Sequence, residues 1–194
     1  MDQPTLYTAR LILRPFTRAD ATAVQRLAGD EAVAEMTLNV PHPYGDGMAE
    51  TWIASHRGAW DAGTAVTFAI TTMDHELRGT ISLQLTAPHR RGEMGYWIGR
   101  PYWGQGIATE AVHGVLDFAF GPLALNRVQA SHLPRNPASG RVMQKAGMQR
   151  EGLHREQYLK GGRFEDVVQY AVLRRDWEST SAGHTSTDHP HHVH

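Results

Sequence analysis

The pattern of apolar and polar positions divides the chain into short strands and helices. Alternating or continuous apolar runs predict strands over residues 11–16, 64–72, 77–85, 91–98, 127–132, 149–158 and 164–173. Apolar residues that recur every three or four positions predict helices over residues 21–28, 47–61, 108–119 and 138–146. Residues 30–46, which include Pro41, Pro43 and Gly45, are predicted to be irregular. This order predicts an α+β fold in which helices cover both faces of a mixed sheet.

Length and composition suit one domain followed by a polar tail. The chain has 194 residues, of which 41% are hydrophobic, enough for one globular core. We assign the domain to residues 1–178 and expect residues 179–194, which are mostly small, polar or histidine, to form a mobile tail. Histidine-rich segments can bind metals, but we prefer adventitious affinity and expect no metal in the reaction.

Charge and cysteine content exclude several classes of function. The formal net charge of −1 predicts neither a nucleic-acid surface nor attraction to an anionic membrane. The absence of cysteine excludes disulfides, thiolate metal sites and a cysteine acyl-enzyme. No apolar run is long enough to span a membrane, and the first residues lack the pattern of a signal peptide. We therefore expect a cytoplasmic location.

The most informative segment, residues 101–111, has the sequence Pro-Tyr-Trp-Gly-Gln-Gly-Ile-Ala-Thr-Glu-Ala and joins a predicted strand to a predicted helix. A glycine turn that enters a helix leaves free backbone N–H groups at the positive end of the helix dipole, an arrangement that suits phosphate. The dinucleotide-binding pattern fails because Thr109 occupies its third glycine position. No Gly-Lys-Ser/Thr follows to make a nucleotide P-loop.

This segment resembles the pyrophosphate loop of the GNAT N-acetyltransferases, in the form typical of the RimJ/RimL-like branch that acetylates ribosomal-protein N-termini. Three other segments match that branch in order: Thr8 to Arg14, Gly95 to Ile98, and Asn136 to Met148. The resemblance implies a mostly antiparallel seven-stranded sheet, splayed between its fourth and fifth strands to admit acetyl-CoA. Backbone groups exposed by the split would pair with the pantetheine arm.

Candidate cofactor contacts come from the strand, the loop and a later helix. They are Trp97, Ile98, Trp103, Gly104, Gln105, Gly106, Ile107, Ala108, Thr109, Asn136, Ser139, Arg141 and Lys145. We assign the pyrophosphate to the amides of residues 104–109, while Arg141 and Lys145, four positions apart on one helix face, could meet phosphates. Pro101 stands where the superfamily usually has Gln or Arg, so Arg100 is a possible substitute.

Two residues are candidates for catalysis. Ser139 lies on the apolar stripe of its predicted helix, and the resemblance implies that it protonates the thiolate of coenzyme A; the alternative is a serine in the helix cap or first turn. Glu93 is the candidate general base, by its place on the strand that precedes the loop and by the resemblance; the alternative is an exposed carboxylate paired with Arg90 or Arg91. Glu110 is a weaker candidate because a first-turn carboxylate also complements the helix dipole.

The sequence leaves the acceptor open. A protein or peptide N-terminal amine is the leading prediction; a small amine such as an aminoglycoside, polyamine or amino acid is the alternative. An acidic pocket formed by residues 30–60 would favour a polycation, and a shallow groove with peptide-like edges would favour a polypeptide. A non-catalytic acyl-CoA-binding module and a homodimer are also left open.

Overall fold

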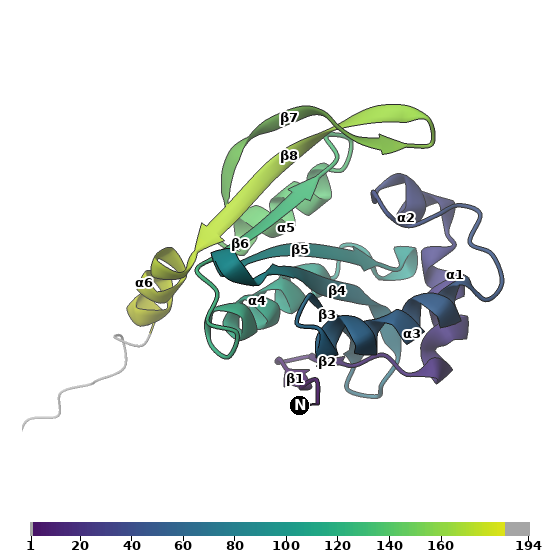
Figure 1. The fold of residues 1–194 in the computed structure, drawn as a ribbon, viewed down its shortest axis with the longest axis horizontal. Helices are drawn as coiled ribbons and strands as arrows, with labels where there is room; N and C mark the ends of the chain where they lie inside the picture. The colour runs from purple at the N-terminus through teal and green to yellow at the C-terminus, as the bar shows by residue number, and fades with distance from the viewer. Residues whose placement is uncertain (1, 185–194) are drawn as a thin grey trace, which may run out of the picture.

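The computed structural model describes residues 2–184, which form one sheet with helices on both faces (Figure 1). The strands are β1 Leu6–Tyr7, β2 Leu11–Arg14, β3 Ala65–Thr72, β4 Leu77–Thr86, β5 Arg91–Ile98, β6 Arg127–His132, β7 Gln149–Lys160 and β8 Arg163–Leu173. The helices are α1 Ala21–Ala28, α2 Glu31–Glu35, α3 Met48–Asp61, α4 Ile107–Phe120, α5 Pro137–Lys145 and α6 Arg174–His184. Short 3₁₀ turns cover Arg18–Asp20, Ala87–His89 and Arg100–Tyr102.

The sheet confirms the predicted α+β class and corrects its strand number. Its order is β1-β2-β3-β4-β5-β6-β8-β7, eight strands rather than seven, because Leu6 and Tyr7 pair with β2. All neighbouring strands are antiparallel except β5 and β6. The segment 30–46 is not wholly irregular, since it contains the one-turn helix α2. Helix α6 includes the first residues of the expected tail, and residues 185–194 lie outside the described part of the chain.

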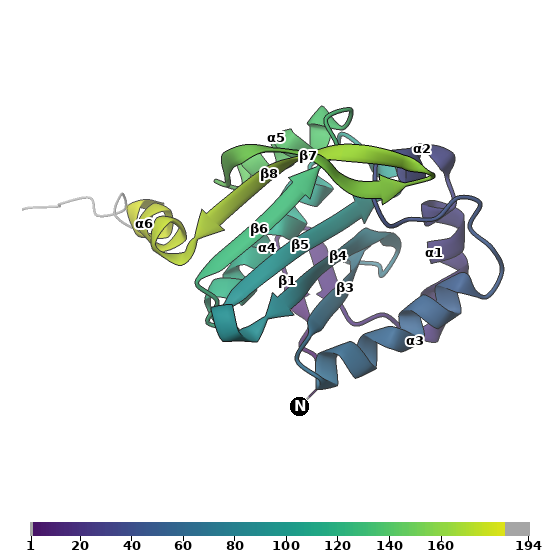
Figure 2. The same cartoon turned by 45° about the horizontal axis from the view of Figure 1, so that its top comes forward.

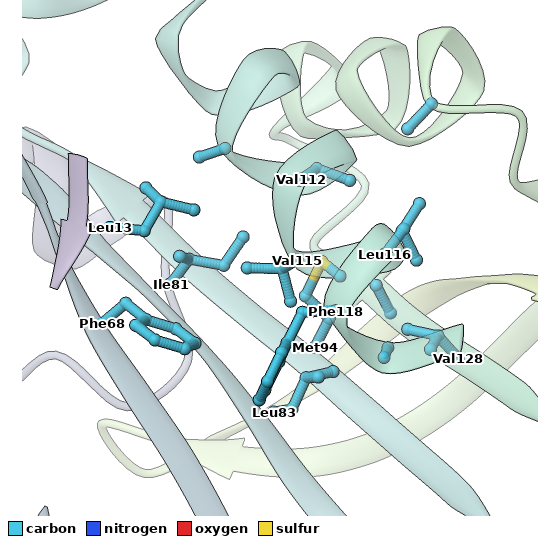
Figure 3. Close-up of a cluster of buried hydrophobic side chains, with 14 of the residues drawn as sticks. Leu13, Phe68, Ile81, Leu83, Met94, Val112, Val115, Leu116, Phe118 and Val128 are labelled. Carbon is cyan, nitrogen blue, oxygen red and sulfur yellow. The ribbon is translucent and has the colours of Figure 1, made fainter. Parts of the chain in front are cut away.

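Two apolar cores lie on opposite faces of the sheet. On one face α4 packs Val112, Val115, Leu116 and Phe118 against side chains from several strands, as Figure 3 shows. On the other face α1 and α3 pack against β3, β4 and Trp97 of β5. No helix within residues 2–184 is both long enough and apolar enough to cross a membrane.

Strands β5 and β6 confirm the predicted split. Their parallel pairing covers only Arg91–Met94 and Arg127–Ala130, although β5 continues to Ile98 and β6 to His132. From Gly95 onward, β5 therefore has no strand partner on the β6 side. The additional strand β1 shifts the numbering by one, so these are the fourth and fifth strands of the expected sheet. The split lies where α4 and α5 begin, and it gives an extended amide-bearing ligand a place to pair.

Candidate active site

The glycine loop before α4 has the geometry of an anion site. Gly104 and Gly106 adopt φ values of +75° and +76°, in the left-handed region that favours glycine. The amide of Glu110 donates to Gly106 O at 3.1 Å, which starts the helix. Within residues 2–184, the amides of residues 104–109 donate to no protein acceptor. Free donors at a helix N-terminus fit a phosphate group, as the sequence predicts.

A cluster of hydrogen bonds among Thr8, Arg10 and Glu110, which the sequence did not predict, holds this loop in position. The carboxylate of Glu110 accepts hydrogen bonds from Thr8 Oγ1 at 2.6 Å, from the Arg10 amide at 2.7 Å and from Arg10 Nε at 2.6 Å. Arg10 Nη1 also donates to Gln105 O at 3.2 Å, within the loop. Partial burial raises the pKa of Glu110, but the bonds from Thr8 and Arg10 outweigh it and leave that pKa lowered. Glu110 is therefore a structural anion.

Ser139 lies in the first turn of α5, where it meets a tyrosine from β5. Its Oγ is 2.8 Å from Tyr96 Oη, and Tyr96 Oη also donates to Ser139 O at 3.2 Å. Burial raises the pKa of Tyr96 to about 12, so its phenol stays protonated at neutral pH. The helix cap is Asn136, whose Oδ1 accepts from the Ser139 amide at 3.2 Å. The Ser139 hydroxyl is therefore not needed to cap the helix.

Asn136 has a second partner that the sequence did not predict. Its Nδ2 donates to Met36 O at 3.0 Å, just after α2. The side chain thus joins the start of α5 to the opposite wall of the site. Both of its side-chain polar atoms have protein partners, and its predicted contact with coenzyme A stays a prediction.

Glu93 faces away from α4, toward the side of the sheet covered by α1 and α3. Alternation along β5 puts Glu93 and Trp97 on this face and Tyr96 on the other. Glu93 Oε2 accepts from Gln129 Nε2 at 3.2 Å. Partial burial and then the nearby Glu93 carboxylate raise the pKa of Tyr158. Among the described residues Glu93 forms no ion pair with Arg90 or Arg91, and Arg90 instead donates to Ala124 O.

One cavity of about 1040 Å³ brings together all the candidate cofactor contacts, Ser139 among them, with Glu93, whereas the weaker candidate Glu110 does not line it. Trp97 only borders it, since 8% of this residue is exposed and its ring packs in the core beneath α1 and α3. Trp103 is 44% exposed and donates from Nε1 to Ile98 O at 2.7 Å. Arg100 does not line the cavity; its guanidinium lies 3.9 Å from Asp30. It is therefore a poor substitute for the Gln or Arg side chain that Pro101 replaces.

The wall formed by α3 contains a half-buried histidine. His56 packs against Trp52, with ring centroids 4.4 Å apart, and against Phe16. Both of its ring nitrogens are buried, and neither has a hydrogen-bond partner among the described residues. Burial lowers the pKa of His56 to about 4, so the imidazole is neutral at neutral pH.

This histidine predicts a pH-dependent stability. Because its folded pKa lies below the ordinary value of 6.5, the unfolded chain binds the proton more tightly, and stability falls as the pH drops from about 6.5 toward 4. Because His56 is partly exposed to solvent, we expect the free energy of unfolding to fall by only roughly 2 kcal/mol over this pH range. Urea unfolding of His56→Phe should show a flatter pH dependence than wild type over this range. Substitution of the exposed His89 by Gln should leave the wild-type slope, and equal slopes for all three proteins would contradict the assignment.

Comparisons with known proteins agree with this geometry. Residues 10–149 match the family model described as the acetyltransferase (GNAT) domain. The chain is 33% identical over 176 residues to the uncharacterized N-acetyltransferase p20 of Bacillus licheniformis, covering 89% of this chain and 98% of the relative. It is 22% identical over 174 residues to a spermidine N(1)-acetyltransferase of Vibrio cholerae, covering 89% and 98%.

A solved structure shows the same fold. The ribosomal L7/L12 alpha-N-protein acetyltransferase RimL, in complex with coenzyme A, superposes with a TM-score of 0.80 at 19% identity, covering 88% of this chain and 98% of that one. The named relatives thus include enzymes for a protein N-terminus and for a polyamine. The amide loop, the split strands and the family match lead to one conclusion: this chain belongs to the GNAT family of N-acetyltransferases.

Proposed function

We propose that this protein transfers the acetyl group of acetyl-CoA to the α-amine of a peptide or protein N-terminus, by direct attack within a ternary complex. The observation that carries the proposal is that one cavity is lined by the amide loop and Ser139 and also by Glu93. An acyl donor and an amine can therefore meet at the split in the sheet without an acyl-enzyme intermediate. The absence of cysteine removes the most reactive covalent alternative.

The glycine loop before α4, the edge of β5 and the helix α5 supply the groups that would bind the acyl donor, acetyl-CoA. The amides of residues 104–109 would hold the pyrophosphate, and the unpaired edge of β5 beyond Met94 would pair with the pantetheine amides. Arg141 and Lys145 are exposed on α5 at the same cavity, where they can meet the remaining phosphate charge. Ser139 would give its hydroxyl proton to the departing thiolate and regain the proton that the attacking nitrogen loses as the amide forms, while Tyr96 holds the serine in place.

Glu93 acts on the acceptor amine as the general base. It accepts the ammonium proton, directly or through a water molecule, and leaves the neutral amine to attack the thioester carbonyl. An N-terminal amine has a reference pKa near 7.7–8.0, against about 10.4 for lysine, so it needs less help to deprotonate at neutral pH. One carboxylate at the cavity, without a catalytic dyad, is consistent with such an acceptor.

The role of Glu93 predicts a change in the pH profile. Glu93→Gln should lower kcat/KM most on the acidic side, and rate should recover as rising pH deprotonates the free amine. Peptide acetylation would be measured between about pH 6 and 9 by release of free coenzyme A. As a control, Glu178→Gln removes a carboxylate on α6 that does not line the cavity. A Glu93→Gln profile parallel to wild type at every pH would contradict the assignment.

The choice between amines is tested by localising the product. A peptide with a free α-amine and one internal lysine is incubated with acetyl-CoA at neutral pH, beside the same peptide with a blocked α-amine and beside spermidine. Tandem mass spectrometry should find the acetyl group on the α-amine, with little modification of the blocked peptide. Preferential acetylation of lysine or spermidine would favour the alternative acceptors. Binding of acetyl-CoA without acetylation of any amine would favour a non-catalytic module.

A further inference from the structure

The acceptor side of the cavity has a chemical character that narrows the substrate. We call its walls, formed by cavity-lining residues between 24 and 84, the acceptor compartment. Apolar side chains from α3 and from the segment between α2 and α3 dominate it, among them Met36, Leu38, Val40, Met48 and Trp52. Threonine, serine and tyrosine hydroxyls, the amides of Asn39 and Gln84 and the His56 imidazole supply its polar groups. The compartment therefore offers a predominantly apolar surface to the group that carries the amine.

Charge is missing from these walls. None of the cavity-lining residues between 24 and 84 is Asp, Glu, Lys or Arg, and Glu93 is the only carboxylate along the whole described lining. Two acidic residues beside the compartment have partners elsewhere: Asp30 accepts from the Ala32 amide at 2.9 Å to cap α2, and Asp46 accepts from Gln25 at 2.8 Å. Glu50 of α3 does not line the cavity, although its charge, after burial, raises the pKa of Tyr44. His56 is neutral, as described above. One carboxylate matches one ammonium, and a second cation would lose its hydration without a partner.

The compartment is held in shape by contacts from the other half of the molecule. Lys160 of β7 donates from Nζ to Ala34 O and Thr37 O, and Asn136 donates to Met36 O at 3.0 Å. Arg135 pairs with Glu165 at 2.6 Å and donates to Glu35 O at 3.2 Å. The tip of the β7–β8 hairpin lies beside α2 in both views (Figures 1 and 2). Lys160 and Arg135 thus stabilise the position of α2 and the residues after it. Both cations already have hydrogen-bond acceptors in the protein.

We propose that the acceptor compartment receives an uncharged, apolar side chain on the residue that bears the reacting amine, so that the substrate is a peptide beginning with a residue such as Leu, Met or Phe. This inference rests on the proposed function and specifies its substrate class. Burial of the apolar side chain contributes affinity, whereas a charged side chain at the same place would be desolvated against Leu38, Met36 and Trp52. Glu93 remains available for the single ammonium.

The test is a set of peptides that differ only in the first residue. Peptides beginning with Leu, Met, Phe, Ala, Glu, Lys or Arg, together with spermidine, are compared by kcat/KM from coenzyme A release. Leu, Met and Phe should exceed Glu, Lys and Arg by about 10–200-fold, the range expected when a hydrophobic pocket discriminates. Leu38→Asp, at a half-buried position outside both apolar cores, should lower this ratio and raise the rate with Lys or Arg. Leu159→Asp, at a 65% exposed position that does not line the cavity, should keep the wild-type ratio.

The possible outcomes distinguish failure of the apolar acceptor compartment from failure of the proposed acetyltransferase function. Equal or faster acetylation of the charged peptides or of spermidine by wild type overturns the apolar compartment but leaves an acetyltransferase. A wild-type ratio retained in a folded Leu38→Asp, verified by its thermal unfolding, also overturns the compartment. No acetylation of any amine, with acetyl-CoA binding intact by calorimetry, overturns the proposed function and the inference with it.

Discussion

Replacement of Ser139 by Ala should lower kcat by about 10²–10⁴, with a much smaller change in affinity for acetyl-CoA. The Ser139 hydroxyl lies at the cavity with Tyr96 as its side-chain partner, while the Asn136 cap bonds the backbone amide and is unaffected by loss of the hydroxyl. The variant therefore removes a proton donor and spares the start of α5. Steady-state rates and calorimetry with coenzyme A measure the two effects separately.

The serine variant has a matched control. Ser179 on α6 bonds only its own helix, to Arg175 O at 2.7 Å, and Ser179→Ala should leave both quantities unchanged. A loss of coenzyme A binding in Ser139→Ala as large as the loss of rate would show that the hydroxyl has a structural role. If neither quantity changed, Ser139 would have no part in the mechanism.

A side chain at Gly106 should raise the KM for acetyl-CoA by about 10–100-fold, because one or two charge-assisted bonds from loop amides to phosphate would be lost. Gly106 has a φ of +76°, where a β-branched residue is strained, and a Cβ there would lie 3.4 Å from Arg10 Nη2. Gly106→Val therefore disturbs both the loop and the guanidinium that fastens it. Calorimetric titration with coenzyme A reports the loss directly.

Gly162 provides the control for backbone strain. Its φ is +79°, its Cβ would meet open space, and it lies in the turn between β7 and β8. Gly162→Val should lower the free energy of unfolding by an amount similar to that in Gly106→Val, without a comparable change in coenzyme A affinity. Unchanged coenzyme A binding in a folded Gly106→Val would exclude the loop as the pyrophosphate site.

The parts of the site that were predictable from sequence are those encoded by neighbouring residues. A glycine turn before a helix is a local signal, and the loop before α4 has the predicted conformation. The extra strand β1 and helix α2 were missed because two and five residues carry too little periodicity. Longer-range contacts left no such signal: Arg10 meets Glu110 across 100 positions, and Tyr96 meets Ser139 across 43. The uncharged acceptor compartment likewise depends on which side chains the fold turns inward.

The central claim is that donor and acceptor react together in one cavity. Initial rates should be measured while acetyl-CoA and an N-terminal peptide are varied against each other, with the intact mass of the protein recorded after exposure to acetyl-CoA alone. Direct transfer predicts intersecting double-reciprocal lines and no acetylated protein. Parallel lines, together with an acetylated protein that passes its acetyl group to the peptide, would contradict the account.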